Sequence, residues 1–166
     1  MAIASALRST AEDVSFMMAK PGIHSVLFDS FADVPDAWHA VCRPDDLAMD
    51  SRALSVFQRT LKEQCRCWGV IVFDGAGTAI GCAALCAFKA GFMSVLFCGL
   101  PVPSGATHLR VRDGACAETV VIEVERAMRG LAASLKSRLL VFKEFGHASK
   151  PLAAAPLSPS SPFVAS

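Results

Sequence analysis

Cysteine is the residue type in this sequence with the widest chemical range, because its thiolate binds metals, attacks electrophiles and forms disulfides. The seven cysteines are Cys42, Cys65, Cys67, Cys82, Cys86, Cys98 and Cys116. Cys65 and Cys67 are spaced more tightly than the cysteines of a zinc knuckle, and no histidine pair at finger spacing follows Cys82 and Cys86. Between a metal site and small buried hydrophobes in a reducing compartment, the spacings favour the second. We therefore expect no metal, and an inert thiol at Cys98 within its apolar run.

Most of these cysteines fall in apolar, β-branched runs that predict strands. We expect strands over 24–28, 67–73, 78–88, 92–98 and 139–142, with a short extended piece over 108–111. Asp74-Gly75 predicts a hairpin turn between the second and third of them. Asp33 is expected to cap a short helix that runs to about Cys42, and Asp50 or Ser51 a second one over 51–63.

The strongest helix signal covers residues 117–137. Its apolar side chains recur with a period of about 3.6, and its acids precede its bases, as the helix dipole favours. The resulting order is β-α-α-β-β-β-α-β. It predicts an α/β (α+β) fold with a mixed, mostly antiparallel sheet, in which strands 92–98 and 139–142 form the one parallel pair.

Two stretches around this helix carry a family resemblance. Phe97 to Gly114 reads FCGLPVPSGATHLRVRDG, and Leu140 to Phe145 reads LVFKEF. With the helix between them, they resemble the GNAT-type acyl-CoA N-acyltransferase fold over about residues 24–145. They are similar to the first half of FemAB-like bacterial acyltransferases, which carry a Pro-x-x-x-Gly segment between the central strand and the long helix.

The resemblance implies acyl-CoA as a co-substrate and an amine-bearing acceptor. The loop before the helix would hold the pyrophosphate through Gly114, Ala115 and Cys116, helped by the helix dipole. The family pattern is Arg or Gln, two residues, Gly, one residue, then Gly or Ala. Here Val111 stands at the basic position, Gly114 matches and Cys116 is small. The alternative is that Gly114 only makes the turn into the helix.

Acyl transfer to an amine also requires a base for the acceptor and an acid for the leaving thiolate. The chain has no tyrosine, the acid common in the fold, so His108, Glu144 and His147 remain as candidates, and we assign the catalytic roles to Glu144 and His108. A protein of a different class remains open: a truncated, non-catalytic remnant or interaction module that keeps the fold without a complete active site.

Composition bounds the partners and the location. The 166 residues carry 16 basic and 15 acidic side chains, a balance that gives no reason to expect nucleic-acid binding. The apolar stretch 75–103 is interrupted by glycines, prolines and Lys89, and the N-terminal residues lack an apolar leader core, so we expect no transmembrane segment and a cytoplasmic protein.

The predicted organisation is a flexible N-terminus over 1–20, an acyltransferase-like domain over 21–148 and a tail over 149–166. The tail is rich in Ala, Pro and Ser, a composition that favours disorder. The last strand, near 139–143, would form an open sheet edge, which predicts self-association.

Overall fold

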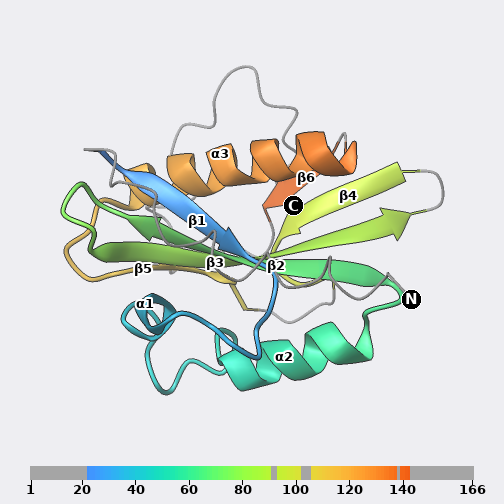
Figure 1. The fold of residues 1–166 in the computed structure, drawn as a ribbon, viewed down its shortest axis with the longest axis horizontal. Helices are drawn as coiled ribbons and strands as arrows, with labels where there is room; N and C mark the ends of the chain where they lie inside the picture. The colour runs from blue at the N-terminus through green and yellow to red at the C-terminus, as the bar shows by residue number, and fades with distance from the viewer. Residues whose placement is uncertain (1–21, 91–92, 102–105, 138, 143–166) are drawn as a thin grey trace, which may run out of the picture.

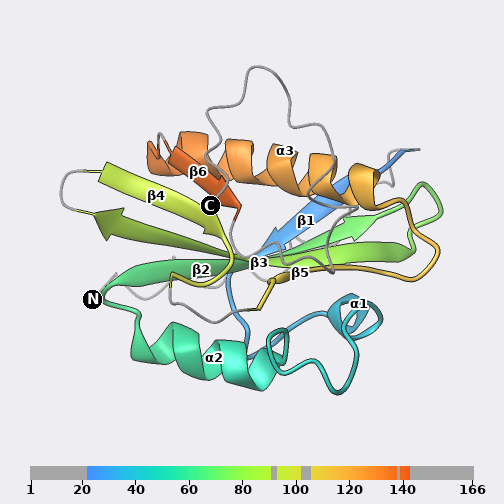
Figure 2. The ribbon, with the colours of Figure 1, turned by 180° about the vertical axis from the view of Figure 1, so that it is seen from behind.

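A mixed six-stranded sheet forms the middle layer of the protein, seen in a computed structural model that describes residues 22–90, 93–101, 106–137 and 139–142. Its strands lie in the order β1 (His24–Phe28), β2 (Cys65–Phe73), β3 (Ala79–Ala90), β4 (Met93–Cys98) and β6 (Leu139–Phe142). The short β5 (Leu109–Val111) pairs with β3. The helix α3 (Ala117–Leu135) covers one face, and α1 (Asp36–His39) and α2 (Ser51–Thr60) cover the other (Figures 1 and 2).

The hairpin of β2 and β3 is the centre of the sheet. The Asp74 carboxylate accepts hydrogen bonds from the amides of Ala76 and Thr78 at 2.9 and 2.8 Å, and Gly77 takes a φ of +78°. The Asp-Gly signal for a hairpin is thereby confirmed. β2 begins two residues earlier than the sequence predicts, because Cys65 and Arg66 pair with Phe88 and Ala87 of the long strand β3.

The parallel pair expected from the sequence is present. β4 and β6 run parallel with Val95 opposite Leu139 and Cys98 opposite Phe142. β4 and β5 pair in succession with β3, β4 along Leu85–Ala90 and β5 along Gly81–Ala83. The chain therefore leaves the sheet after Cys98, returns at Leu109, and enters α3 at the end of the sheet distant from the β4–β6 pair.

The structure confirms the N-cap expected for the second helix but not the one expected for the first. Asp50 caps α2, where its carboxylate accepts the Arg52 amide at 2.8 Å, and α3 ends where Lys136 adopts a left-handed φ of 54°. The expectation that Asp33 caps the first helix is wrong. Pro35 is the N-cap of α1, because its fixed φ of −60° is combined with an extended ψ and the first helical residue is Asp36.

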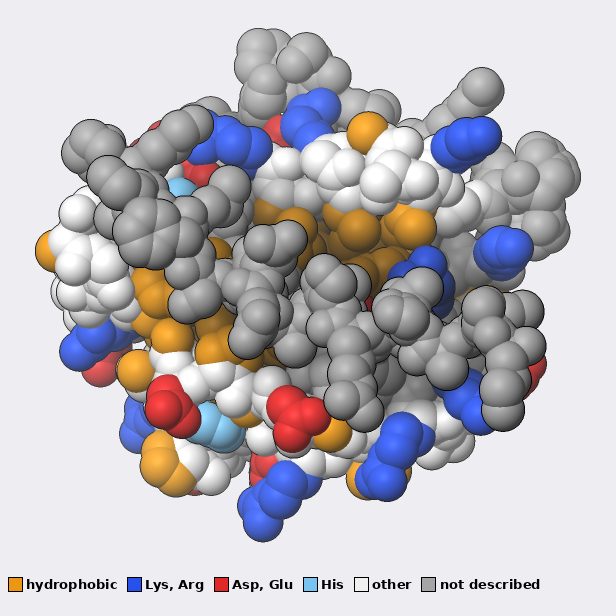
Figure 3. Space-filling view, viewed as in Figure 1, with side chains coloured by type: hydrophobic (Ala, Val, Ile, Leu, Met, Phe, Trp, Pro, Cys, Tyr) orange, Lys and Arg blue, Asp and Glu red, His pale blue; other side chains and the backbone are white. Residues whose placement is uncertain are grey.

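Each face of the sheet has its own core. Beneath α3 the core is mainly aliphatic, including Leu85, Leu96, Val124 and Met128. Hydrophobic side chains gather where α3 meets the sheet in Figure 3. Beneath α1 and α2 the core is made largely of aromatic rings and thiols. Since strand side chains alternate between faces, odd positions of β2 such as Cys67 and Ile71 belong to the second core, and even positions such as Val70 to the first.

The fold class is confirmed as a mixed, mostly antiparallel sheet with flanking helices. The predicted segments 1–20 and 149–166 lie outside the described residues, as does the strand end at Lys143. Among the helices of the described residues, none combines the length and the apolar character needed to cross a membrane.

Candidate functional site

An open groove lies at the start of α3, and we call it the α3 groove. It has a volume of about 430 Å³. Residues 112–116 and Thr119 line it from the loop and first turn of the helix, and Asp74 and Thr78 line it from the β2–β3 hairpin. All three residues that the sequence assigns to acyl-CoA binding, Gly114, Ala115 and Cys116, therefore lie in one groove.

The loop that enters α3 is a tight turn centred on Gly114. The Ala115 amide donates to the Arg112 carbonyl at 3.0 Å, and Gly114 adopts a φ of +83°, a backbone conformation that glycine adopts without steric cost. Cys116 is the N-cap, and its carbonyl accepts the Val120 amide at 3.2 Å. The start of α3, where the leading amides of a helix have no intrahelical acceptor, therefore lies at the groove.

Cys116 is an exposed thiol in this groove. Hydrogen bonds from the Thr119 side chain, and then from the Thr119 and Glu118 amides, lower the pKa of its thiol by favouring the thiolate. The helix N-terminus acts in the same direction. The sulfur that the sequence treats as merely small is therefore the most readily ionised thiol for which a shift is resolved in the described residues.

The charges of the α3 groove are mixed. Arg112 brings a guanidinium group, which donates weakly to the Ala79 carbonyl at 3.4 Å, while Asp74 and Asp113 bring carboxylates. Sequence reasoning missed Arg112 because the family pattern places its basic residue one position earlier, at Val111. A basic side chain two residues before Gly114 could have indicated Arg112 as a phosphate-binding residue, because guanidinium groups bind phosphate through paired hydrogen bonds.

The two catalytic candidates are not brought together with this groove. His108 is 2% exposed, and its carbonyl accepts the Ala84 amide at 2.9 Å just before β5 begins. It is not among the residues that line the α3 groove. Glu144 lies outside the described residues. The proton-transfer roles of both residues stay predictions.

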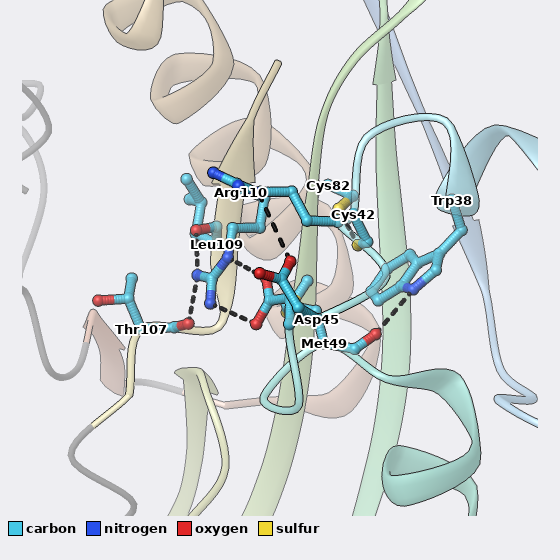
Figure 4. Close-up of polar contacts among 10 residues, drawn as sticks. Trp38, Cys42, Asp45, Met49, Cys82, Thr107, Leu109 and Arg110 are labelled. Atoms are coloured by element: carbon cyan, nitrogen blue, oxygen red, sulfur yellow. Dashed lines mark hydrogen bonds and ion pairs between the residues drawn. The ribbon is translucent and has the colours of Figure 1, made fainter. Parts of the chain in front are cut away.

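A charged pair holds the start of β5 against the loop between α1 and α2. Arg110 donates to both Asp46 carboxylate oxygens, and through Nη1 to the carbonyls of Thr107 and Leu109 at 2.5 and 2.9 Å (Figure 4). The Asp46 side chain is only 12% exposed. This pair links the start of β5 to the loop between α1 and α2, close to the buried His108.

The cysteines depart from the expectation of separate buried thiols in three places, one of which is Cys42, half-buried with its Sγ 3.3 Å from that of Cys82. Cys67 and Cys86 form a disulfide, because the register of β2 and β3 sets them opposite each other. Cys116 is exposed, because it lies in a loop rather than a strand. Cys98 follows the expectation: complete burial raises the pKa of its thiol to about 12.

Comparison with known proteins adds no assignment, since no family model and no curated protein matches this chain.

Proposed function

We propose that this protein is an acyltransferase-like protein that transfers an acyl group from acyl-CoA, or from an aminoacyl donor, to an amine acceptor in the cytoplasm. The observation that supports the proposal most is the path of the chain. An antiparallel meander leads through β4, a loop and α3 into β6, which lies parallel to β4. The resemblance described for the sequence implies this path.

The α3 groove suits the pyrophosphate part of such a donor. The leading amides of a helix and its dipole attract phosphate oxygens, and the Arg112 guanidinium can form two parallel hydrogen bonds to them. A Cβ built at Gly114 would meet no atom within 4 Å, so the space beside the Gly114 backbone is open and a phosphate group can approach it. The carboxylates of Asp74 and Asp113 oppose an anion and set a limit on affinity.

The proposed reaction is attack of the acceptor nitrogen on the thioester carbonyl carbon. The new C–N bond forms, the C–S bond breaks, a base removes the extra proton from nitrogen, and the CoA thiolate leaves and takes up a proton. Glu144 is the proposed base. His108 is buried, so a local movement of the chain would have to expose its ring before it could transfer a proton to or from a substrate.

The second candidate is a non-catalytic remnant or interaction module. The lack of tyrosine, the burial of His108 and the two carboxylates in the groove favour it. It predicts the same fold without affinity for acyl-CoA.

Thermal unfolding with acetyl-CoA and longer acyl-CoAs separates the two candidates. A donor present at a hundred times its dissociation constant should raise the melting temperature by roughly 5–10 °C for a chain of this size. Arg112→Glu should abolish the rise, and Arg59→Glu on α2, on the opposite face of the sheet, should keep it. Absence of any shift at millimolar ligand leaves the remnant as the better description.

The proposal includes self-association through β6. β6 is the last strand in the order of the sheet and forms its edge among the described residues, with Leu140 and Phe142 buried on the face beneath α3. Such an edge accepts a strand from another copy. Light scattering at micromolar concentration should report a dimer or larger species, and a clean monomer would show that the edge is covered.

A further inference from the structure

Three sulfur atoms meet in the core beneath α2. Cys65 and Cys67 lie on β2, Cys86 lies on β3, and their Sγ atoms are all within 4.8 Å of one another. We call these three residues the thiol triad. Positions 65 and 67 share a face because strand side chains alternate, and the register places Cys86 directly opposite Cys67. The triad is therefore fixed by the central hairpin of the fold.

The spacing of Cys65 and Cys67 fits two thiolates on one ion, and the strand register holds Cys86 directly opposite Cys67. A metal–sulfur distance of about 2.3 Å places the sulfurs of a three- or four-coordinate site roughly 4 Å apart. The Sγ atoms of Cys65 and Cys67 are 4.0 Å apart. Thiolates select soft cations over hard ones, and all three cysteines belong to the buried core beneath α1 and α2.

The triad also has a way in from solvent. A groove of about 160 Å³ is lined by Cys65 and Cys67, together with the cationic side chains of Lys62 and Arg66 and the carboxylate of Asp29. The Arg66 guanidinium lies over the Trp68 ring, 5.1 Å from its centroid, which leaves Lys62 as the cation beside the Asp29 carboxylate and gives the groove little net charge. Burial raises the pKa of the Cys65 thiol, so the metal itself must drive the loss of its proton.

We propose that Cys65, Cys67 and Cys86, when reduced, bind one soft, thiophilic metal ion of the class of Zn²⁺, Cd²⁺ and Cu⁺. The Cys67–Cys86 disulfide is the metal-free, oxidised state of this site. A small thiol reductant opens it: two reductant thiols become one disulfide, and the protein gains two thiols. Binding of a divalent ion by the three thiols then forms three metal–sulfur bonds and releases three protons.

The proposed site departs from the expectation of no metal, which was drawn from spacing along the chain. Cys65 and Cys67 alone are too close in sequence for a knuckle, and the third ligand comes from the facing strand 19 residues beyond Cys67. The site is independent of acyl transfer, because the α3 groove lies at the start of α3 on different residues.

Cadmium titration of the full chain tests the proposal. In protein reduced with a phosphine under anaerobic conditions, Cd²⁺ should produce a thiolate-to-cadmium charge-transfer band that saturates at one equivalent. Cys65→Ser and Cys86→Ser should remove most of the band. Cys98→Ser, in the core beneath α3, and Cys82→Ser, elsewhere on β3, are the matched controls and should retain it.

A second measurement needs no substitution. In urea sufficient to expose the buried thiols of the reduced, metal-free protein, bound Cd²⁺ should slow the alkylation of Cys65, Cys67 and Cys86 of the unaltered protein, as mapped by peptide mass spectrometry, while Cys116 stays reactive. The proposal is overturned if the reduced protein gives no saturable band, if the band survives in Cys65→Ser and Cys86→Ser, or if protection maps to cysteines outside the triad.

Discussion

The two faces of the sheet are built from different materials. On one face, the valines, a methionine and alanines of the long helix α3 pack against aliphatic side chains of the strands. Under α1 and α2, two shorter helices and their loops cover the rings of Phe28, Phe31 and Trp38, together with most of the cysteines. The first face is a single periodic contact, whereas the second is assembled from pieces distant in sequence.

This difference affects how each face obtains its specificity. Aliphatic side chains pack without direction, so the α3 face depends on shape and volume. The rings of the other face meet edge to face, with Phe28 and Trp38 centroids 5.5 Å apart, and the Trp38 Nε1 donates to the Met49 carbonyl at 3.1 Å. On this face, ring geometry and a hydrogen bond determine the packing, whereas on the α3 face the periodic contacts of one long helix do so.

The largest expected effect comes from removing the centre of the aromatic face. Trp38 is completely buried, so Trp38→Ala should lower the free energy of unfolding by about 3–5 kcal/mol. Trp38→Phe keeps most of the ring volume but leaves the Met49 carbonyl without its donor, and should cost less than the alanine variant. Urea denaturation measures both. A loss under about 1 kcal/mol for Trp38→Ala would mean that the α1 layer contributes little to the fold.

Sequence reasoning succeeded where a local pattern decides the structure. The bounds of β1, the starts of β6 and α3, the Asp74 turn and the Asp50 cap (one of two candidates) were predicted, because alternation, turn residues and helical period are determined within a few residues. The parallel pairing of β4 with β6 followed from the handed connection through α3.

It failed where distant segments decide. The disulfide and the thiol triad depend on the register between β2 and β3, which no spacing along the chain contains. The Arg110–Asp46 pair near the buried His108 joins residues that are 64 positions apart. The sequence predicted that residues 114–116 line a binding site, but only the structure shows that Asp74 of the β2–β3 hairpin lines the same groove.

The shape dependence of the α3 face can be tested at Gly81. A Cβ at this position would collide with Val120 of α3 and lie 3.2 Å from the Arg110 carbonyl. We expect Gly81→Ala to destabilise the protein by about 1–3 kcal/mol through overpacking.

Two variants sharpen the test at Gly81. Val120→Ala in the same chain should recover part of the loss, which a double-mutant cycle measures. Gly130→Ala, in α3 where a Cβ meets nothing within 4 Å, should instead stabilise by about 0.5–1 kcal/mol. Equal effects of the two glycine substitutions would contradict tight packing of α3 on β3.

The α2 layer has a smaller, electrostatic contribution at its cap. Asp50→Ala should cost about 1 kcal/mol, because the Arg52 amide loses its acceptor. The Arg52 side chain lowers the pKa of the Asp50 carboxyl, so the cap's contribution is present above the pKa of an unfolded aspartate, about 3.9, and is lost as the pH falls below it. Asp45→Ala, which breaks only an exposed pair with Arg43, is the control and should change stability by less than about 0.5 kcal/mol.

The smallest effect on stability, and a distinct effect on reactivity, is expected at the two thiols of the α3 side. Cys116 is exposed and the pKa of its thiol is lowered, while Cys98 is buried with a pKa of about 12. Alkylation by iodoacetamide requires the thiolate. Its rate at Cys116 should therefore rise with pH at values below the usual cysteine pKa of about 8.5, and Cys98 should stay unmodified while the protein is folded.

Thr119→Val is the variant that tests the cause of the Cys116 reactivity. It keeps the shape of the side chain but removes the hydroxyl that contributes most to lowering the pKa of Cys116, so the pH profile of alkylation should move upward. Ser134→Ala removes a hydroxyl near the other end of α3, where it bonds the Leu131 carbonyl, and should leave the profile in place. If Thr119→Val leaves the profile unchanged, the helix N-terminus alone activates the thiol. If Cys98 is alkylated as fast as Cys116 in the folded protein, the α3 face is not the closed aliphatic layer that distinguishes it from the aromatic one.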